Sequence, residues 1–337
     1  MMTDIKILGI ETSCDETAAA IVKNGQEIIS NVVQSQISLH QKFGGVVPEV
    51  ASRKHIETIS AVVKEAFAQA GLRYEDIAAV AVTNQPGLIG ALLVGLNFAK
   101  GLAYALDKPL IAVNHLHGHI YANFLEHPEI EFPCICLVVS GGHTSLLHIP
   151  SHHEYRIIGE TRDDAAGEAF DKVARFLGLA YPGGPSIEKA ARDGVPGLYK
   201  LPRIFLDRQD FEFSFSGLKT AVMNQWRKLE KTGQANVNDM AAEFQQALTE
   251  VLVEKTIRAA EKYGVKTVLM AGGVAANMQL RTKLQEKAAD CQLMVRYPSL
   301  SLCTDNAAMI AGRGYIQYIS QDFASLDINA YPGLLSL

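Results

Sequence analysis

The sequence predicts an α/β protein built from two related lobes. Its 337 residues exceed the roughly 250–300 at which single hydrophobic cores stop growing. Strand-like and helix-like apolar patterns alternate along the chain, as βαβ units require. After Pro133 a pattern of three short strands begins a second time. We therefore expect domains at residues 1–132 and 133–337, with a helical insert at about 163–260.

The first half opens with three strands. β-branched and apolar residues predict strands at 5–11, 18–22 and 27–37, and Asn24-Gly25 predicts a tight hairpin turn before the third. Right-handed crossovers are expected to follow, because strands then alternate with helices. The further expected elements are a loop at 39–47, a helix at 48–70, a strand at 78–83, a helix at 88–106, a strand at 110–113 and a helix at 116–125.

The second half repeats the strand, polar turn, strand pattern. Residues 7–17 and 138–144 both combine an apolar strand with a turn of small or hydroxyl residues, which indicates an internal duplication. The remaining expected elements are strands at 134–140, 145–149 and 155–159, helices at 163–177, 186–193, 218–229 and 237–263, a strand at 265–270, a helix at 278–289, a strand at 293–295 and a helix at 306–318.

Charge and cysteine content narrow the class of protein. A net charge of −5 gives no global reason to expect nucleic-acid binding, so local patches or another subunit must hold any polyanion. Lys219, Arg227, Lys228 and Lys231 are candidates for such a patch, although solvated helix charges are the simpler explanation. Five cysteines without a Cys-x-x-Cys pair favour buried thiols in a reducing compartment.

Targeting signals are expected to be absent. The N-terminus runs directly into a strand, which argues against a signal peptide. We also expect no apolar run close to the ~18 residues that span a bilayer. A cytoplasmic enzyme is the resulting expectation.

The segment 114–119, Asn-His-Leu-His-Gly-His, is the central candidate site. His115 and His119 are four residues apart at the start of an expected helix, so both imidazoles lie on one face and can share a divalent metal. His117 points to the other side. The spacing also arises by chance, and the Glu that follows the first His of a zincin is missing. Asp305, in a polar tip before another helix, is the best third ligand, and two His with one carboxylate leave positions open for a substrate.

Three further segments have features of a nucleotide site. The turn at 140–142, Ser-Gly-Gly, lets a backbone approach a phosphate, although it also fits an ordinary hairpin. The strand ending in Gly272-Gly273 leads to Asn277, which is suited to a base or sugar contact or to a simple helix start. Asp171 is suited to accept hydrogen bonds from two ribose hydroxyls, or simply to interact favourably with the dipole near the start of its helix. These segments describe a nucleotide held between two lobes, with a metal beside its phosphate.

Longer motifs, in order along essentially the whole chain, resemble the TsaD family, whose older name is O-sialoglycoprotein endopeptidase. The matching motifs are Gly9–Thr17 (GIETSCDET), His115-x-x-x-His119, Val139–Thr144 (VSGGHT), Asp163–Lys172 (DDAAGEAFDK), Tyr181–Pro185 (YPGGP), Phe213–Lys219 (FSFSGLK) and Ser301–Asn306 (SLCTDN).

The resemblance implies a fold and a reaction. The fold would be two duplicated lobes of the actin/hexokinase/Hsp70-like (ASKHA) type with a nucleotide cleft between them. The reaction would transfer threonylcarbamoyl from threonylcarbamoyl-AMP to N6 of the tRNA adenosine beside the anticodon, in tRNAs that read codons starting with A. Bacterial members work with a degenerate TsaB-like paralogue and a small TsaE-like P-loop ATPase.

The resemblance also implies roles for individual residues. His115, His119 and Asp305 would bind one divalent metal, usually iron, with zinc as the alternative. We further hypothesise that Glu11 positions the transfer or assists proton removal, although a structural turn acid is equally consistent. The residues that would hold the substrate are Val138, Val139, Ser140, Gly141, Gly142, Asp171, Gly184, Asn277 and Glu188, the last replacing an Asp of some members.

Three other functions remain open from the sequence. A metalloendopeptidase is disfavoured because no Glu follows His115. An ATPase or sugar kinase of the same fold would turn over ATP without tRNA. A non-catalytic nucleotide-binding scaffold would tolerate loss of both histidines.

Overall fold

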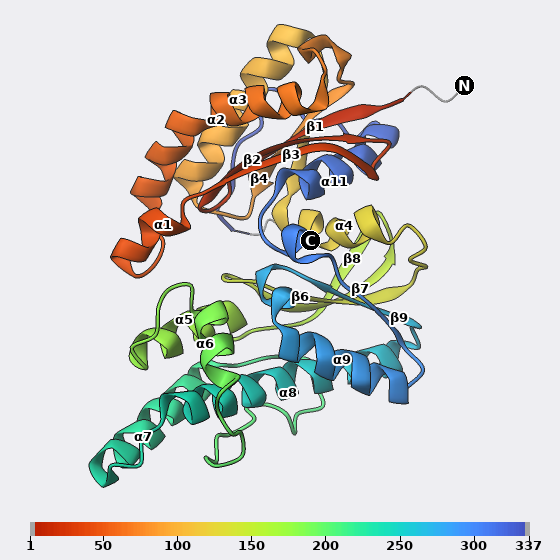
Figure 1. Ribbon diagram of the computed structural model, residues 1–337. Coiled ribbons are helices and arrows are strands. Elements are labelled where there is room, and N and C mark those ends of the chain that lie inside the picture. The colour runs from red at the N-terminus through yellow and green to blue at the C-terminus, as the bar shows by residue number, and fades with distance from the viewer. Residues whose placement is uncertain (1–3, 334–337) are drawn as a thin grey trace. The chain divides into compact units, whose positions relative to one another are not determined.

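The computed structural model of the protein describes residues 4–333, which form two compact units (Figure 1). Unit 1 comprises Met1–Ile130 and Pro298–Leu337, and unit 2 comprises Glu131–Tyr297. Residues 1–3, on which the argument against a signal peptide partly depends, lie outside the described residues.

Unit 1 contains a five-stranded mixed sheet in the order β3-β2-β1-β4-β5. The strands β1, β2 and β3 are an antiparallel meander, and β4 and β5 continue the sheet in parallel with β1. Asn24 and Gly25 both have positive φ (51° and 73°), as the predicted tight turn requires. The strands are β1 Lys6–Glu11, β2 Glu16–Lys23, β3 Glu27–Ser35, β4 Ala79–Gln85 and β5 Leu110–Asn114.

Helices cover the sheet of unit 1. The helix α2 begins with Pro48 at its first position and is capped by Gly71 (φ 64°), so it covers the predicted residues 48–70. The expected loop at 39–47 contains short helical turns instead. The helical segments are α1 Ile37–His40, η1 Gln41–Phe43, α2 Pro48–Ala70, η2 Tyr74–Asp76, α3 Ile89–Leu106, α4 His115–Glu126, α10 Leu300–Cys303 and α11 Ala307–Ile319.

Unit 2 repeats this topology with different helices. Its sheet order β8-β7-β6-β9-β10 matches that of unit 1 strand for strand, with a meander followed by two parallel strands. The strands are β6 Cys134–Val139, β7 Thr144–Ser151, β8 Glu154–Glu160, β9 Thr267–Ala271 and β10 Met294–Arg296. The helices are α5 Ala166–Phe176, α6 Gly183–Ala191, α7 Ser216–Thr232, α8 Val237–Tyr263, η3 Gly273–Ala276 and α9 Met278–Asp290.

Two sequence-based boundaries differ from the structure. The second domain was expected to run to residue 337, but α11 packs on β1 and α4 of unit 1, so the chain returns to the first unit. The helix expected at 186–193 begins three residues earlier as α6, at Gly183, whose amide is held by Asp171. Local periodicity indicates neither the packing of α11 on unit 1 nor the hydrogen bond between Gly183 and Asp171.

The expectation of no bilayer-length apolar run is wrong for α3. This 18-residue helix is long and apolar enough to cross a membrane by length and composition alone. Asn97 and Lys100 interrupt its apolar run, which is why reading the sequence by continuous runs missed it. In the structure its face at Leu92, Leu96 and Ala99 is buried, and the helix packs on α2 and β4. A core helix passes the same test, so α3 is weak evidence for a membrane.

Candidate metal centre and neighbouring substrate loops

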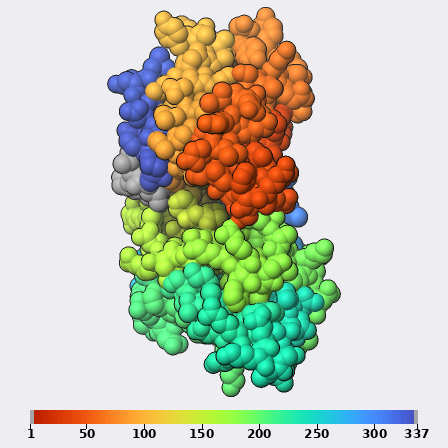
Figure 2. All heavy atoms as spheres, turned by 90° about the vertical axis from the view of Figure 1, so that its left-hand side faces the viewer, coloured from red at the N-terminus to blue at the C-terminus, as the bar shows by residue number. Residues whose placement is uncertain are grey.

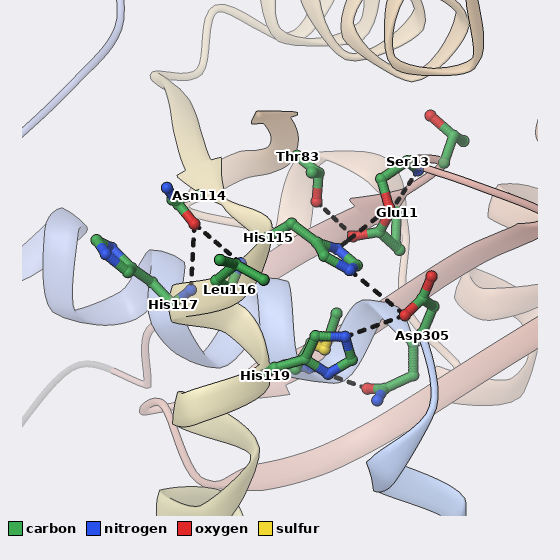
Figure 3. A network of polar contacts seen from close by, with 12 residues as sticks. Glu11, Ser13, Thr83, Asn114, His115, Leu116, His117, His119 and Asp305 are labelled. Carbon is green, nitrogen blue, oxygen red and sulfur yellow. Dashed lines mark hydrogen bonds and ion pairs between the residues drawn. The ribbon is translucent and has the colours of Figure 1, made fainter. Parts of the chain in front are cut away.

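The two candidate histidines lie at the start of α4, directly after β5. The Oδ1 atom of Asn114 accepts hydrogen bonds from the amides of Leu116 (2.9 Å) and His117 (3.3 Å) and thereby caps the helix. Helical spacing then places the rings of His115 and His119 edge to face, with centroids 4.6 Å apart (Figure 3). Both side chains are buried.

Asp305 completes a group of three. Its Oδ1 atom lies 3.4 Å from Nε2 of His115 and 3.1 Å from Nε2 of His119 (Figure 3). The three ligand atoms lie within 4.8 Å of one another. Two imidazoles and a carboxylate are a donor set that suits a divalent transition metal with open positions. The structure thus brings together the three residues selected from the sequence and forms a candidate metal site.

Close packing of α11 places Asp305 beside α4. Asn306 caps α11 by accepting the amide of Met309 (3.0 Å), so Asp305 directly precedes the helix. A Cβ atom at Gly9 of β1 would lie 2.3 Å from the Ala307 carbonyl oxygen. A larger residue would therefore push this end of α11 away from β1.

Glu11 lies on the other edge of the His115 ring. Its side chain is fully buried, and Oε2 lies 3.0 Å from Nδ1 of His115. The Thr83 hydroxyl donates to the same oxygen (2.5 Å), and the Ser13 amide donates to Oε1 (2.5 Å). A carboxylate that accepts Nδ1–H fixes the tautomer in which Nε2 has the free lone pair. The ring is therefore oriented for ligation through Nε2.

The electrostatics of the centre favour a cation. Burial raises the pKa of Glu11, but His115 outweighs burial and holds that pKa below its ordinary value. The pKa of Asp305 is likewise lowered, because His115 and His119 outweigh its burial. Burial lowers the pKa of His115, but Glu11 and Asp305 raise it well above the usual value. The buried Glu11 carboxylate and the partly exposed Asp305 carboxylate thus remain ionised beside the rings, and a divalent cation would take the place of the proton on Nε2 of His115.

His117 does not belong to the centre, as the sequence predicts. Its side chain points away from the other two rings (Figure 3). Burial, together with Arg313, lowers the pKa of His117 to about 3. This residue is therefore neutral at physiological pH.

Two residues of the centre, Thr83 and Ser13, were not identified as site residues from the sequence. Thr83 lies two residues before the end of β4, a buried strand parallel to β1, and the carboxyl ends of parallel strands share one edge of a sheet. A polar residue near the carboxyl end of an apolar strand was the available signal. Ser13, whose Oγ lies 3.2 Å from Nδ1 of His115, stands in the turn after Glu11.

In unit 2, four segments meet at the carboxyl ends of β6 and β9. A Cβ atom at Gly272, where φ is +92°, would lie 2.4 Å from the Val139 carbonyl oxygen. The Gly167 amide donates to the Ser140 carbonyl (3.2 Å), and the Gly183 amide donates to Oδ1 of Asp171 (2.6 Å). The turn after β6 thus lies beside β9 and α5, and α5 holds the start of α6.

Asn277 and Glu188 also connect these segments. Asn277 is buried, caps α9 through the Leu280 amide (2.9 Å) and donates to Oε1 of Gln245 (2.9 Å). Oε1 of Glu188 accepts the Met278 amide (2.9 Å) and ties α6 to α9. The simple helix-start role of Asn277 is therefore observed, and Gln245 is a neighbour that the sequence did not reveal.

The open glycines of unit 2 lie in the same segments. A Cβ atom at Gly141, Gly142 or Gly184 would meet no atom of the described residues within 4 Å. Their backbone is therefore accessible to a ligand. Val138 and Val139 are fully buried in β6 and support the turn from below.

Fold and site together define a duplicated α/β protein with a His-His-carboxylate centre in its first unit. A family model for TsaD, described as tRNA N6-adenosine threonylcarbamoyltransferase, matches residues 27–312. The chain belongs to this family.

Relatives with that name align over nearly the whole chain. The Syntrophomonas wolfei protein is 70% identical over 331 residues, covering 98% of both chains. The Moorella thermoacetica protein is 56% identical over 335 residues, covering 99% of this chain and 98% of that one.

Two solved structures share the fold. HypF from T. kodakarensis superposes with a TM-score of 0.63 at 16% identity, over 95% of this chain and 48% of that chain. Component A of the Acidaminococcus fermentans (R)-2-hydroxyglutaryl-CoA dehydratase gives 0.57 at 18% identity, over 94% and 99%. At this identity the likeness concerns the fold alone, and it confirms the predicted fold class.

Proposed function

We propose that this chain transfers threonylcarbamoyl from threonylcarbamoyl-AMP to N6 of the tRNA adenosine beside the anticodon, in tRNAs that read codons starting with A. The observation that carries the proposal is the centre formed by His115, His119 and Asp305. The chain that contains this centre is 70% identical to a protein named for this activity. The donor is an activated mixed anhydride. The N6 amine forms a C–N bond with the carbamoyl carbon, the C–O bond to phosphate breaks, AMP leaves, and N6 loses a proton.

We propose that His115, His119 and Asp305 hold one divalent metal, Fe²⁺ before Zn²⁺. Two His and one carboxylate with open positions are typical of Fe²⁺ sites, whereas Zn²⁺ accepts the same ligands. When bound, the metal would supply Lewis-acid polarisation of donor oxygens. The protein's part is to keep both Nε2 atoms and the Asp305 carboxylate aimed at one point.

We propose that Glu11 is a positioning residue. The sequence left open whether it orients the transfer or removes a proton. Its oxygens accept from Thr83, from the Ser13 amide and from His115, which supports orientation of the His115 ring. Glu11 also faces Nδ1, the ring edge opposite Nε2, so it does not stand where the base of a zincin would.

We propose that the adenylate is held by the predicted residues of unit 2. The open backbone of Gly141, Gly142 and Gly184 suits phosphate or ribose contacts, and Ser140 stands beside them. Val138 and Val139 shape the base of this turn. Asp171 would receive ribose hydroxyls while it holds the Gly183 amide, and Asn277 and Glu188 would border the same site.

We propose that tRNA, a TsaB-like paralogue and a TsaE-like P-loop ATPase are the partners, and that the cytoplasm is the compartment. Because the proposed substrate is tRNA, we expect the chain in the compartment in which tRNA is modified. A polyanionic substrate and a net charge of −5 favour help from other subunits.

The decisive experiment compares His119→Ala with the matched variant His117→Ala on the opposite side of α4. Metal is measured by mass spectrometry of anaerobically purified protein, and product by nucleoside digestion of tRNA after reconstitution with both partners. We expect H119A to lose metal and at least ~100-fold of activity, because one of three ligands is missing. H117A should keep its metal.

Thermal melting tests whether both variants are folded. A folded, metal-free H119A that modifies tRNA at the wild-type rate would refute the proposal. Cleavage of a peptide substrate in the absence of tRNA would instead favour the endopeptidase alternative.

A further inference from the structure

Positive charge is distributed unevenly between the two units. Unit 1 carries 10 Lys and Arg against 16 Asp and Glu, whereas unit 2 carries 21 against 20. The net negative charge of the chain therefore comes from unit 1. A polyanionic partner is repelled least by unit 2, so a docking surface is best sought there.

Ion pairs distinguish the candidate cations of the helical insert: some are paired with acidic residues and others are not. Lys172 and Lys219 both pair with Asp164, at 2.7 Å and 3.2 Å. Lys219 was one of four candidates from the sequence, and this pairing removes it. The other three, Arg227, Lys228 and Lys231, are exposed and form no ion pair with any described residue.

These three cations lie together on α7. The buried side of the helix carries Leu218 and Val222, and the helix packs on α5 and α8. Arg227 and Lys228 lie four and three residues before Lys231, so each is its neighbour on the helix surface, and all three are exposed. In Figure 2 the green-to-teal segments of the insert form a continuous surface of unit 2.

The start of α7 is firmly held. Asp163 accepts hydrogen bonds from the Ser214 hydroxyl (2.5 Å), the Phe215 amide (2.7 Å) and the Ser216 hydroxyl (2.7 Å). These bonds join the segment before α7 to the loop before α5. These bonds and the buried Leu218 and Val222 hold the N-terminal half of α7, whereas the three cations lie on its exposed C-terminal half.

We propose that Arg227, Lys228 and Lys231 of α7 dock the phosphate backbone of the tRNA. The inference rests on the proposed function, because that function supplies the polyanion. Exposed cations that form no ion pair replace counterions along a nucleic-acid backbone without reading its sequence. The competing explanation is that cations near the last turn stabilise the helix dipole, which predicts a change in stability and none in tRNA affinity.

The test uses the full-length variant R227Q/K228Q/K231Q. Its matched control is K42Q/K64Q/K266Q, which removes three exposed charges elsewhere. Fluorescence anisotropy with unmodified tRNA measures affinity over a salt series. We expect the α7 variant to bind at least ~10-fold more weakly at low salt, and the slope of log affinity against log salt to fall by about 2–3. The charge-preserving variant R227K/K228R/K231R should bind like wild type, as should the control.

Two results would overturn the inference. One is an affinity of the α7 variant equal to that of the control. The other is a loss that follows a lowered melting temperature, as a helix-dipole role predicts. Because binding is measured without turnover, a wild-type chain that binds through α7 but leaves tRNA unmodified would count against the proposed function alone.

Discussion

At the scale of single residues, the centre depends on which nitrogen of His115 is available. Glu11 occupies the Nδ1 edge, and Asp305 lies on the Nε2 side. The spacing of the histidines and the polar tip at Asp305 were readable from the sequence, because helical geometry and residue chemistry are local. The contact of Thr83 with Glu11 was not readable, because it follows from the parallel register of β1 and β4.

Replacing Glu11 by Gln tests this arrangement. The amide keeps the size of the side chain but removes the charge that fixes the His115 ring, so metal affinity should fall about 10–100-fold. Competition with a chelator measures the affinity. Thr83→Val removes one hydrogen bond to the same carboxylate and should cost less. Equal metal affinity of E11Q and wild type would show that Glu11 does not orient the ring.

At the scale of elements, the centre depends on how closely α11 approaches β1. Periodicity predicted α11 to within a residue or two, but nothing local indicates that this helix returns to unit 1. The signal was in the glycines. Gly9 interrupts a β-branched strand, where a missing side chain marks the close approach of another backbone.

Gly9→Ala should therefore weaken the candidate metal site, although Gly9 is not one of its ligands. Its Cβ would meet the Ala307 carbonyl oxygen, so α11 must shift and carry Asp305 with it. We expect a loss of about 1–3 kcal/mol in the free energy of unfolding, measured in urea, together with weaker metal binding. Gly101→Ala in α3, where a Cβ would meet no atom of residues 4–333 within 4 Å, is the control and should be neutral or slightly stabilising. An unchanged G9A protein would mean that α11 does not set the position of Asp305.

At the scale of the whole molecule, one topology occurs twice with different chemistry at its turns. The β1–β2 turn provides carboxyl and hydroxyl groups, whereas the β6–β7 turn provides Ser140 and open glycines. The duplication was readable because both halves repeat the same order of strands. The division of the chain was not fully readable, because a returning helix looks like a continuation of the second half.

The division predicts different folding behaviour for isolated segments. Residues 131–297 are continuous and contain a complete sheet with its helices, so this segment should melt cooperatively on its own. Residues 1–130 lack α11, whose absence would expose the face of β1 around Gly9 and the side of α4 at Gly118. This segment should show no cooperative transition by circular dichroism. Joining residues 298–337 to it through a flexible linker should restore both the transition and metal binding. Cooperative melting of residues 1–130 alone would show that unit 1 does not need its C-terminal helix.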